Sequence, residues 1–244
     1  MTNRVWRRLG ALIGIALTAT VARATPPAGP GGLTVAPVLL SLADARRSVS
    51  TIVTNPSEAP ITVQVRLCSW TMKGEEEVYA PATDIGFSPP LFRLEPHATQ
   101  AVRIVAKVPP GAIERSYRLI VDQLPLASAP GQLQLPVRMV LPVFIEPAAG
   151  ASHLPQLQWS ARYEAQSGLV TVAVANGGGV HARIVDLSAD DGHGAAPVAP
   201  GLSGYALAGQ TRSWSYRPKL APDRLTITAD IGTTTTRATV PVAR

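Results

Sequence analysis

Short β-prone runs, each ended by turn-forming residues, recur along almost the whole chain and leave no room for long helices. They come about every 10–15 residues and are separated by proline, glycine, asparagine and aspartate, which is typical of all-β proteins. Beyond the N-terminus, no stretch of useful length shows the hydrophobic period of an amphipathic helix. With about seven such runs in each half, the sequence predicts an all-β fold of two β-sandwiches.

The predicted strands of the first half are Leu33–Leu42, Val49–Thr54, Ile61–Trp70, Phe92–Leu94, Ala101–Ala106, Ser116–Gln123 and Gln132–Ile145. Those of the second half are Leu157–Tyr163, Gly168–Ala175, His181–Leu187, Arg212–Tyr216, Arg224–Ile231 and Thr235–Val242. The longer predicted turns and loops are Gly74–Glu77, Pro81–Pro90 and Gly192–Gly204. Glu146–Ala151 is the best linker candidate, so we expect an N-terminal domain over residues 25–147 and a C-terminal domain over residues 148–244.

Residues 1–24 have the pattern of a secretory signal peptide. Arg4, Arg7 and Arg8 precede an apolar stretch, and Ala22-Arg23-Ala24 supplies the small residues that signal peptidases select. The apolar stretch is too short to span a bilayer. We therefore expect cleavage after Ala24, export, and no membrane insertion of the mature protein; an uncleaved amphipathic anchor is the alternative.

Removal of this leader changes the charge of the chain. The leader holds four of the 22 basic residues and none of the 16 acidic ones, which leaves a net charge of about +2. So small a charge does not indicate a nucleic-acid partner. Cys68 is the only cysteine, so an exported chain must rely on its hydrophobic cores. This suits a Gram-negative periplasm, and Cys68 itself is expected to be a small buried side chain.

No arrangement of residues typical of catalysis or metal binding is present in the sequence. The four histidines lack ligand spacing, and there is no cysteine pair and no Gly-x-Ser-x-Gly motif. The acidic run Glu75–Glu77 predicts a solvated loop. Asn176–Gly179 predicts a hairpin loop, because a strand follows it where a phosphate-binding loop needs a helix. We therefore expect a non-enzymatic protein without a metal or cofactor.

Two arginines stand in predicted strands that are otherwise apolar. Arg118 lies in the run Ser116–Gln123, and Arg138 lies in the next run, Gln132–Ile145. A charge inside an apolar sheet is unfavourable unless it meets a partner. Each side chain must therefore reach solvent at a sheet margin or pair with an anion. For Arg118 the alternatives are Asp122, another acid at a cleft between domains, or an anionic ligand.

An ordered set of short motifs resembles the periplasmic pilus chaperones of the chaperone–usher pathway. The run Ser116–Pro125 is similar to the F-strand motif of that family. The other motifs fall in the order that the family shows: Asn55-Pro56, the strand ending at Trp70, Ser88–Pro90, Gln100–Arg103, Leu169–Gly178, Ala182–Ile184, Gly201–Tyr205 and Trp214. The later ones look like the second domain of the archaic (sigma, spore-coat-protein-like) branch, so the resemblance covers essentially all of the mature chain.

The resemblance implies two immunoglobulin-like domains in an L or boomerang arrangement, a periplasmic location, no catalysis, and pilin subunits and an outer-membrane usher as partners. Such chaperones add a strand to an incomplete subunit, the donor-strand complementation known for chaperone–pilin complexes. Here the lent strand would be Gln132–Val143, with Leu133, Leu135 and Val137 as donor side chains. The same side chains also fit the core of an ordinary last strand, while Pro136 favours a sheet edge.

The expected anchor for the subunit's C-terminal carboxylate departs from the better-known branch of the family. That branch uses a basic residue on the first strand and a lysine late in the last strand. Here Leu33–Leu42 has no basic residue, and Pro142 stands at the late position. Arg118 and Arg138 are the available candidates, because two parallel N–H groups of a guanidinium match the two oxygens of a carboxylate.

Two other functions remain open for an exported protein of two sandwiches. A structural pilin or adhesin would usually have one domain and its own N-terminal donor segment, whereas this chain has two complete strand series. A carbohydrate-binding module would need clustered exposed aromatic residues, and the five tyrosines and four tryptophans are scattered along the sequence.

Overall fold

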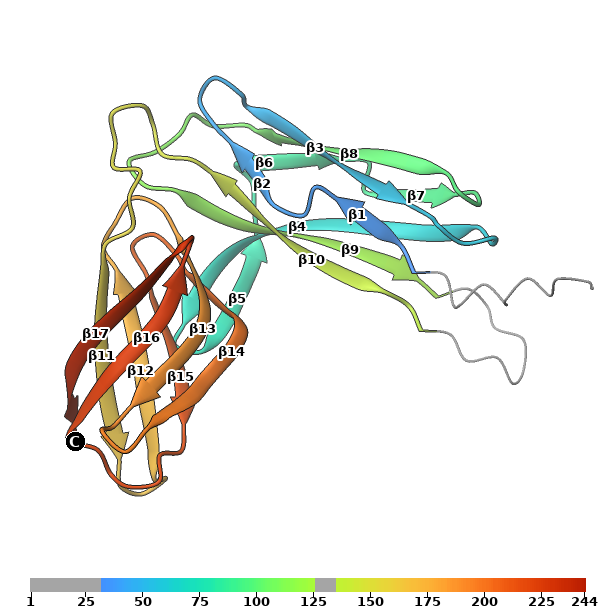
Figure 1. The fold of residues 1–244 in the computed structure, drawn as a ribbon. Helices are drawn as coiled ribbons and strands as arrows, with labels where there is room; N and C mark the ends of the chain where they lie inside the picture. Colours follow the sequence, from blue (N-terminus) through green and yellow to red (C-terminus); the bar gives the residue numbers. More distant parts are fainter. Residues whose placement is uncertain (1–31, 126–134) are drawn as a thin grey trace, which may run out of the picture.

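The computed structural model describes residues 32–125 and 135–244, which contain 17 strands and no helix (Figure 1). The predicted signal peptide lies outside the described residues. The first ten strands are β1 (Thr34–Ala36), β2 (Leu40–Leu42), β3 (Ser48–Thr54), β4 (Ile61–Lys73), β5 (Glu76–Pro81), β6 (Ile85–Ser88), β7 (Leu91–Leu94), β8 (Thr99–Ala106), β9 (Arg115–Leu124) and β10 (Arg138–Ile145). The others are β11 (Leu157–Glu164), β12 (Leu169–Asn176), β13 (Ala182–Asp190), β14 (Ala195–Ala206), β15 (Thr211–Tyr216), β16 (Arg224–Ile231) and β17 (Thr234–Ala243). Across the described ranges, no helix is long and apolar enough to cross a membrane.

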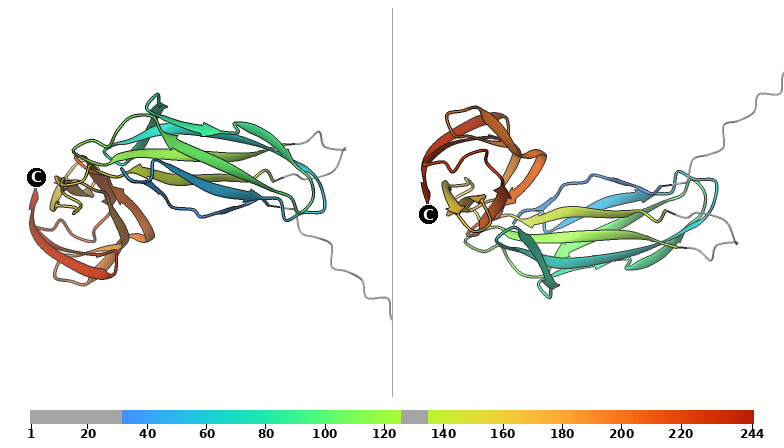
Figure 2. Two further views of the ribbon diagram at one scale, coloured as in Figure 1. Left: turned by 90° about the horizontal axis from the view of Figure 1, so that it is seen from above. Right: turned by 90° about the horizontal axis from the view of Figure 1, so that it is seen from below.

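The strands form two sandwiches that meet at an angle and give the molecule an L shape (Figures 1 and 2). Strands β1–β10 make the first sandwich, and β11–β17 make the second. The predicted all-β fold, with two immunoglobulin-like sandwiches in an L arrangement, is confirmed. The domain boundary predicted between Pro147 and Ala148 falls in the connection from β10 to β11 and stays a prediction.

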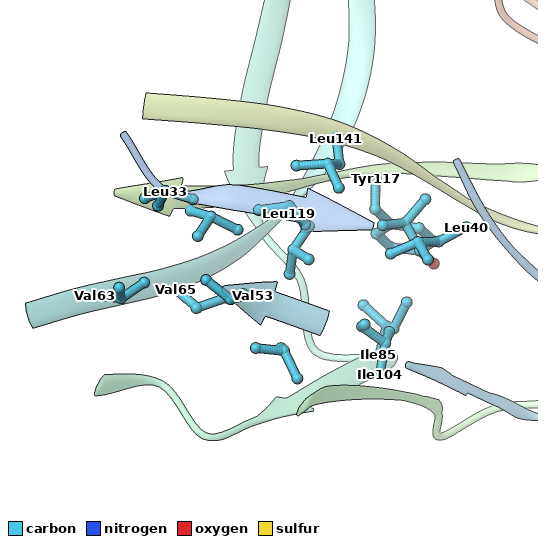
Figure 3. Close-up of a cluster of buried hydrophobic side chains, with 14 of the residues drawn as sticks. Leu33, Leu40, Val53, Val63, Val65, Ile85, Ile104, Tyr117, Leu119 and Leu141 are labelled. Carbon is cyan, nitrogen blue, oxygen red and sulfur yellow. The ribbon is translucent and has the colours of Figure 1, made fainter. Parts of the chain in front are cut away.

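The first sandwich packs two sheets around a core of mostly aliphatic side chains (Figure 3). One sheet has the order β1-β3-β8-β6, and the other has the order β2-β10-β9-β4-β5, with β7 paired to β4. Along β8, Val102, Ile104 and Ala106 are buried while their neighbours are more exposed, the alternation of a half-buried strand. Each buried Val, Leu or Ile contributes about 1.5–3 kcal/mol, so the alternation fixes which face of a strand points inward.

The second sandwich is one continuous path of seven strands, β14-β13-β16-β17-β11-β12-β15. The path folds back on itself at β17, which pairs with β16 along its length but with β11 at two positions only. Val170, Val172 and Val174 of β12 therefore share one core with Leu225 and Ile227 of β16.

Two of the predicted loops contain strands, so those predictions are wrong. The segment Pro81–Pro90 includes β6, which pairs with β8, and Gly192–Gly204 includes most of β14, which pairs with β13. β14 lies at the end of the strand order, and its pairing with β13 has three register shifts. An edge strand with bulges tolerates the prolines and glycines that suggested a loop.

The loop at Asn176–Gly179 joins two strands that do not pair with each other, so the predicted hairpin is also wrong. β12 pairs with β11 and β15, while β13 pairs with β14 and β16. The loop crosses between the layers and lies against another segment of backbone. A Cβ atom on Gly179 would lie 1.9 Å from the carbonyl oxygen of Ser152, so only glycine permits this approach.

The β4–β5 hairpin of the first sandwich reaches the second sandwich. Gly74 at its tip has a φ of 63°, which favours glycine, and its carbonyl accepts a hydrogen bond from the Ser213 N–H of β15 at 3.2 Å. On the same hairpin, the Met72 N–H donates to Gln210 Oε1 at 2.7 Å.

Two further contacts fix the junction between the sandwiches. Trp70 packs edge-to-face on Tyr205, with ring centres 5.4 Å apart. His181 of the second sandwich stacks on Phe144 at 3.8 Å, and its Nδ1 lies 2.8 Å from Oε1 of the buried Glu114. These contacts join a hydrophobic cluster to a partly buried polar pair, so the relative position of the two sandwiches is set by specific packing.

Candidate functional site

One face of the β10-β9-β4 sheet carries both predicted arginines. Strand alternation places Leu119 and Val121 in the first core, and Arg118, Ile120 and Asp122 on the opposite face. We call this opposite surface the cleft face, because one end of it meets the second sandwich (Figure 1). It consists of Gln64, Arg66, Cys68, Trp70, Ser116, Arg118, Ile120, Asp122, Arg138, Val140, Pro142 and Phe144. Cys68 is therefore only partly buried, against the expectation of a buried side chain.

Arg118 is buried at the junction end of the cleft face and is paired with Glu77. Only 9% of its side chain is exposed. Its Nη2 donates to both carboxylate oxygens of Glu77, at 2.8 and 2.9 Å, and its Nε donates to Oε2 at 3.2 Å. The guanidinium carbon also lies 3.5 Å from the ring centre of Trp70, a cation–π contact. Pairing with an acid at the cleft was one of the alternatives for Arg118, and its role as an anchor stays a prediction.

Glu77 comes from the edge strand β5, and 27% of its side chain is exposed. The hydroxyl of Tyr79 donates to Glu77 Oε2 at 2.6 Å. Burial and this hydrogen bond to a carboxylate raise the pKa of Tyr79 to about 12. The sequence assigned Glu77 to a solvated turn, and that expectation is wrong: β5 already begins at Glu76 and holds Glu77 on Arg118.

Arg138 lies near the other end of the cleft face, where 64% of its side chain is exposed. Its Nε donates to Asp122 Oδ1, and Arg66 Nη2 donates to Asp122 Oδ2 at 2.6 Å. Burial alone would raise the pKa of Asp122, whose side chain is only 10% exposed. The hydrogen bonds from the two arginines outweigh burial and lower that pKa. Arg138 as a carboxylate anchor likewise stays a prediction.

The last strand of the first sandwich, β10, has an open edge over residues 138–142. β9 pairs with all of β10, whereas β2 pairs only with its last three residues. The Gln123 N–H donates to the Val137 carbonyl at 2.8 Å, so the hydrogen-bonded pairs with β9 fall at odd-numbered residues. The N–H and C=O of Val140 therefore point away from β9. Pro142, which has no N–H, occupies the same outward register. Another extended chain can pair with such an edge.

The predicted donor residues have different surroundings. Leu133 lies outside the described residues. Leu135 is 63% exposed, so its side chain is available to a partner. Val137 is partly buried and packs against the first core, as the alternative of an ordinary last strand expects. The donor role of the three residues stays a prediction.

A second arginine at the junction was missed by the sequence analysis. Arg212 is in β15, and its Nη1 lies 3.6 Å from the sulfur of Met72 on the β4–β5 hairpin. The Nε of Arg212 is buried and has no hydrogen-bond partner in the part of the chain that the structure describes. No motif around Arg212 signals this position, because only the packing of the two sandwiches brings it near β5.

Comparison with known families decides what this fold belongs to. Residues 32–151 match the family described as pili and flagellar-assembly chaperone, PapD N-terminal domain. Through its first sandwich, the chain belongs to this family of pilus-assembly chaperones. No curated protein matches the sequence of the chaperone.

Solved structures share the fold of the whole chaperone. One is the CsuC–CsuE chaperone–tip adhesion subunit pre-assembly complex from archaic chaperone-usher Csu pili of Acinetobacter baumannii, with 21% identity, 87% of this chain and 99% of that chain covered, and a TM-score of 0.68. The YadV chaperone has 13% identity, 84% and 99% coverage, and a TM-score of 0.61. The Salmonella enterica SafA pilin in complex with the SafB chaperone has 16% identity, 85% and 95% coverage, and a TM-score of 0.61. At these identities the likeness establishes the two-sandwich fold.

Proposed function

We propose that this protein is a periplasmic chaperone that binds pilin subunits by strand addition along β10 and delivers them to an outer-membrane usher. The observation that carries the proposal is the open edge at residues 138–142, in a chain whose first sandwich belongs to the chaperone family. Related folds that occur in complexes with a pilin and with a tip adhesion subunit support it. Family membership also favours this function over a structural pilin, an adhesin or a carbohydrate-binding module.

The two parts of the edge have different tasks in this proposal. Main-chain groups such as the N–H and C=O of Val140 supply affinity without regard to sequence, and side chains such as Leu135 fill the groove of the incomplete subunit. The function is binding, and it needs neither a catalytic group nor a cofactor. The predicted signal peptide would deliver the chain to the periplasm, where pilins and the usher meet it.

Val140→Pro tests the main-chain part of the proposal. Proline removes the outward N–H of Val140 but no hydrogen bond to β9, so the variant is expected to fold and to capture little or no co-produced pilin subunit. Val140→Ala is the matched control, because it shortens the side chain and keeps the N–H. Capture of the subunit by the proline variant at the wild-type level would contradict strand addition along this edge.

Leu135→Asp tests the side-chain part. A charge at this exposed position should block insertion into an apolar groove and leave the chaperone folded. Val105→Asp is the matched control, because Val105 is also exposed but lies on the other sheet of the first sandwich. The donor assignment fails if both variants capture pilin equally well.

A further inference from the structure

A buried carboxylate of the first sandwich is bound by a histidine of the second. Glu114 lies just before β9, and 3% of its side chain is exposed, against 22% for His181, which lies just before β13. The Nδ1 of His181 lies 2.8 and 3.0 Å from the two carboxylate oxygens, and the main-chain N–H of His181 donates to Oε1 at 3.1 Å. In the part of the chain that the structure describes, no other residue hydrogen-bonds to this carboxylate.

The same two residues also join the backbones of the sandwiches. The main-chain N–H of Glu114 donates to the Gly179 carbonyl at 2.8 Å, and the Gly179 N–H donates to the Leu154 carbonyl, in the connection between the sandwiches, at 3.1 Å. The ring of His181 stacks on Phe144 near the end of β10, with 12° between the ring planes. Glu114 and His181 therefore contact both sandwiches and β10.

The charge of this pair depends on the protonation of the imidazole. Histidine is the side chain that ordinarily changes its charge between about pH 5 and 8. A neutral imidazole can donate one hydrogen bond from Nδ1, but the buried carboxylate then keeps a negative charge that the ring does not balance, which is unfavourable. A protonated imidazole makes the same contact an ion pair, and charge-assisted hydrogen bonds are roughly twice as strong as neutral ones. The contact is therefore stronger at the acidic end of this range.

The other ionisable groups on the elements packed around the ring leave this dependence in place. Tyr205 of β14 has its ring centre 5.5 Å from that of His181, and a phenol keeps its proton between about pH 5 and 8. Charged groups of β9 are already in ion pairs of their own, namely Arg118 with Glu77 and Arg115 with Asp84.

We propose that Glu114 and His181 form a pH-sensitive latch between the two sandwiches, which is closed when the imidazole is protonated and weakened when it is neutral. The proposal goes beyond subunit binding, because it concerns the junction that fixes the L shape. The contribution of the latch to the junction is complete while His181 carries its proton, and it is lost as the pH rises and that proton is released.

The experiment measures opening of the latch by amide hydrogen exchange in the free chaperone. The probe is the main-chain N–H of residue 114, because its hydrogen bond crosses between the sandwiches. Its protection factor, which compares its exchange rate with that of an unstructured peptide at the same pH, is measured at about pH 5.5 and about pH 8.

Two variants and a matched control are compared with wild type. His181→Asn keeps a side-chain donor that cannot take up a proton, and Glu114→Gln removes the charge of the carboxylate. His97→Asn is the control, because His97 also pairs with an acid, Glu58, at 3.2 Å, but both of these side chains are exposed and belong to the first sandwich.

In wild type, the protection factor of the residue 114 amide should be about five- to tenfold higher at the lower pH, the gain expected when a neutral hydrogen bond becomes charge-assisted. His97→Asn should show the same difference. His181→Asn should have equal protection at both pH values, at the level of wild type at the higher pH. Glu114→Gln should lose the difference as well, so the inference stays testable if one of the two variants does not fold.

Equal protection of the wild-type amide at both pH values overturns the inference, and so does a pH difference that persists in His181→Asn. If His181 served for packing alone, the variant would lose protection at both pH values and wild type would show no difference between them. These measurements need no pilin subunit, so they can fail while the proposed function holds, and the reverse.

Discussion

The two ends of the cleft face pair an arginine with an acid in opposite environments. At the junction end, Arg118 is enclosed by Trp70 and held by Glu77 through three hydrogen bonds. At the far end, Arg138 is mostly solvated and shares Asp122 with Arg66. An exposed ion pair contributes about 0–1 kcal/mol, whereas breaking a buried one costs about 3–5 kcal/mol. The comparison shows that the surroundings of an arginine in an apolar strand, more than its place in the sequence, decide what it can do.

Arg118→Ala should have the largest effect of any change on the cleft face. It should cost about 2–5 kcal/mol of subunit affinity. It should also lower the free energy of unfolding by about 2–3 kcal/mol, less than for a fully buried pair because Glu77 stays partly solvated. Urea unfolding and subunit capture measure the two effects separately. Arg118→Lys should recover only part of the affinity, since lysine cannot make two parallel hydrogen bonds.

If Arg118→Ala loses stability but no affinity for the subunit, the assignment of Arg118 as the carboxylate anchor is wrong. Arg118 would then be a structural member of the junction, and the anchor would lie elsewhere on the cleft face, with Arg138 as the next candidate. The measurement on Arg118 therefore decides between the two ends.

At the far end, the stability losses caused by replacing Arg138 and Arg66 should not be additive. Arg138→Ala and Arg66→Ala should each lower the free energy of unfolding by less than about 1 kcal/mol, because the partner arginine still holds Asp122. The double variant leaves a mostly buried carboxylate unpaired and should lose about 1–3 kcal/mol, more than the sum of the single losses. Additive losses in urea unfolding would show that the two arginines do not share Asp122.

Low pH should lower the free energy of unfolding by protonating Asp122 at the far end of the cleft face. Its pKa is lower in the folded chain than in the unfolded one, where it is about 3.9. Its contribution to stability is therefore complete above the unfolded pKa and is lost as the pH falls through the folded pKa. The stability difference between wild type and Asp122→Asn should be constant near neutral pH and shrink below about pH 4. A difference that grows on acidification would contradict the hydrogen bonding described for Asp122.

The strands of the first sandwich follow well from the sequence, because alternation of apolar and polar residues is local. β3, β8 and β9 were predicted in nearly their observed positions, and the two arginines stood out as charges in apolar runs. The contacts that were missed join residues that lie far apart in the sequence. Glu77 meets Arg118 across 41 positions, and Arg212 meets Met72 across 140. An acidic run after a glycine favours a turn on local grounds, and only pairing with β4 shows that it enters an edge strand.

β14 shows the same kind of error over a longer segment, because local chemistry again pointed away from a strand. Its glycines and prolines favour a loop, yet it pairs with β13 along its whole length through bulges. The pairing of β13 with β14 depends on how the whole second sandwich closes, and no local sequence pattern predicts this pairing. Sequence reasoning therefore identified Arg118 and Arg138 but could not identify which acid each arginine meets.

The smallest expected effect, a shifted tyrosine titration, tests whether Glu77 is held in place. The Tyr79 hydroxyl donates to Glu77, and its pKa is about 12, against about 10 for a free tyrosine. A raised tyrosine pKa means that the interaction stabilises the fold below pH 10 or so and is lost as the pH rises through the folded pKa.

The ultraviolet absorbance change of wild type minus that of Tyr79→Phe isolates this titration. In Glu77→Gln it should move back toward 10, while Glu76→Gln should leave it in place. A Tyr79 that already titrates near 10 in wild type would mean that its hydroxyl is neither buried nor bound to Glu77, so Tyr79 would not hold Glu77 in place.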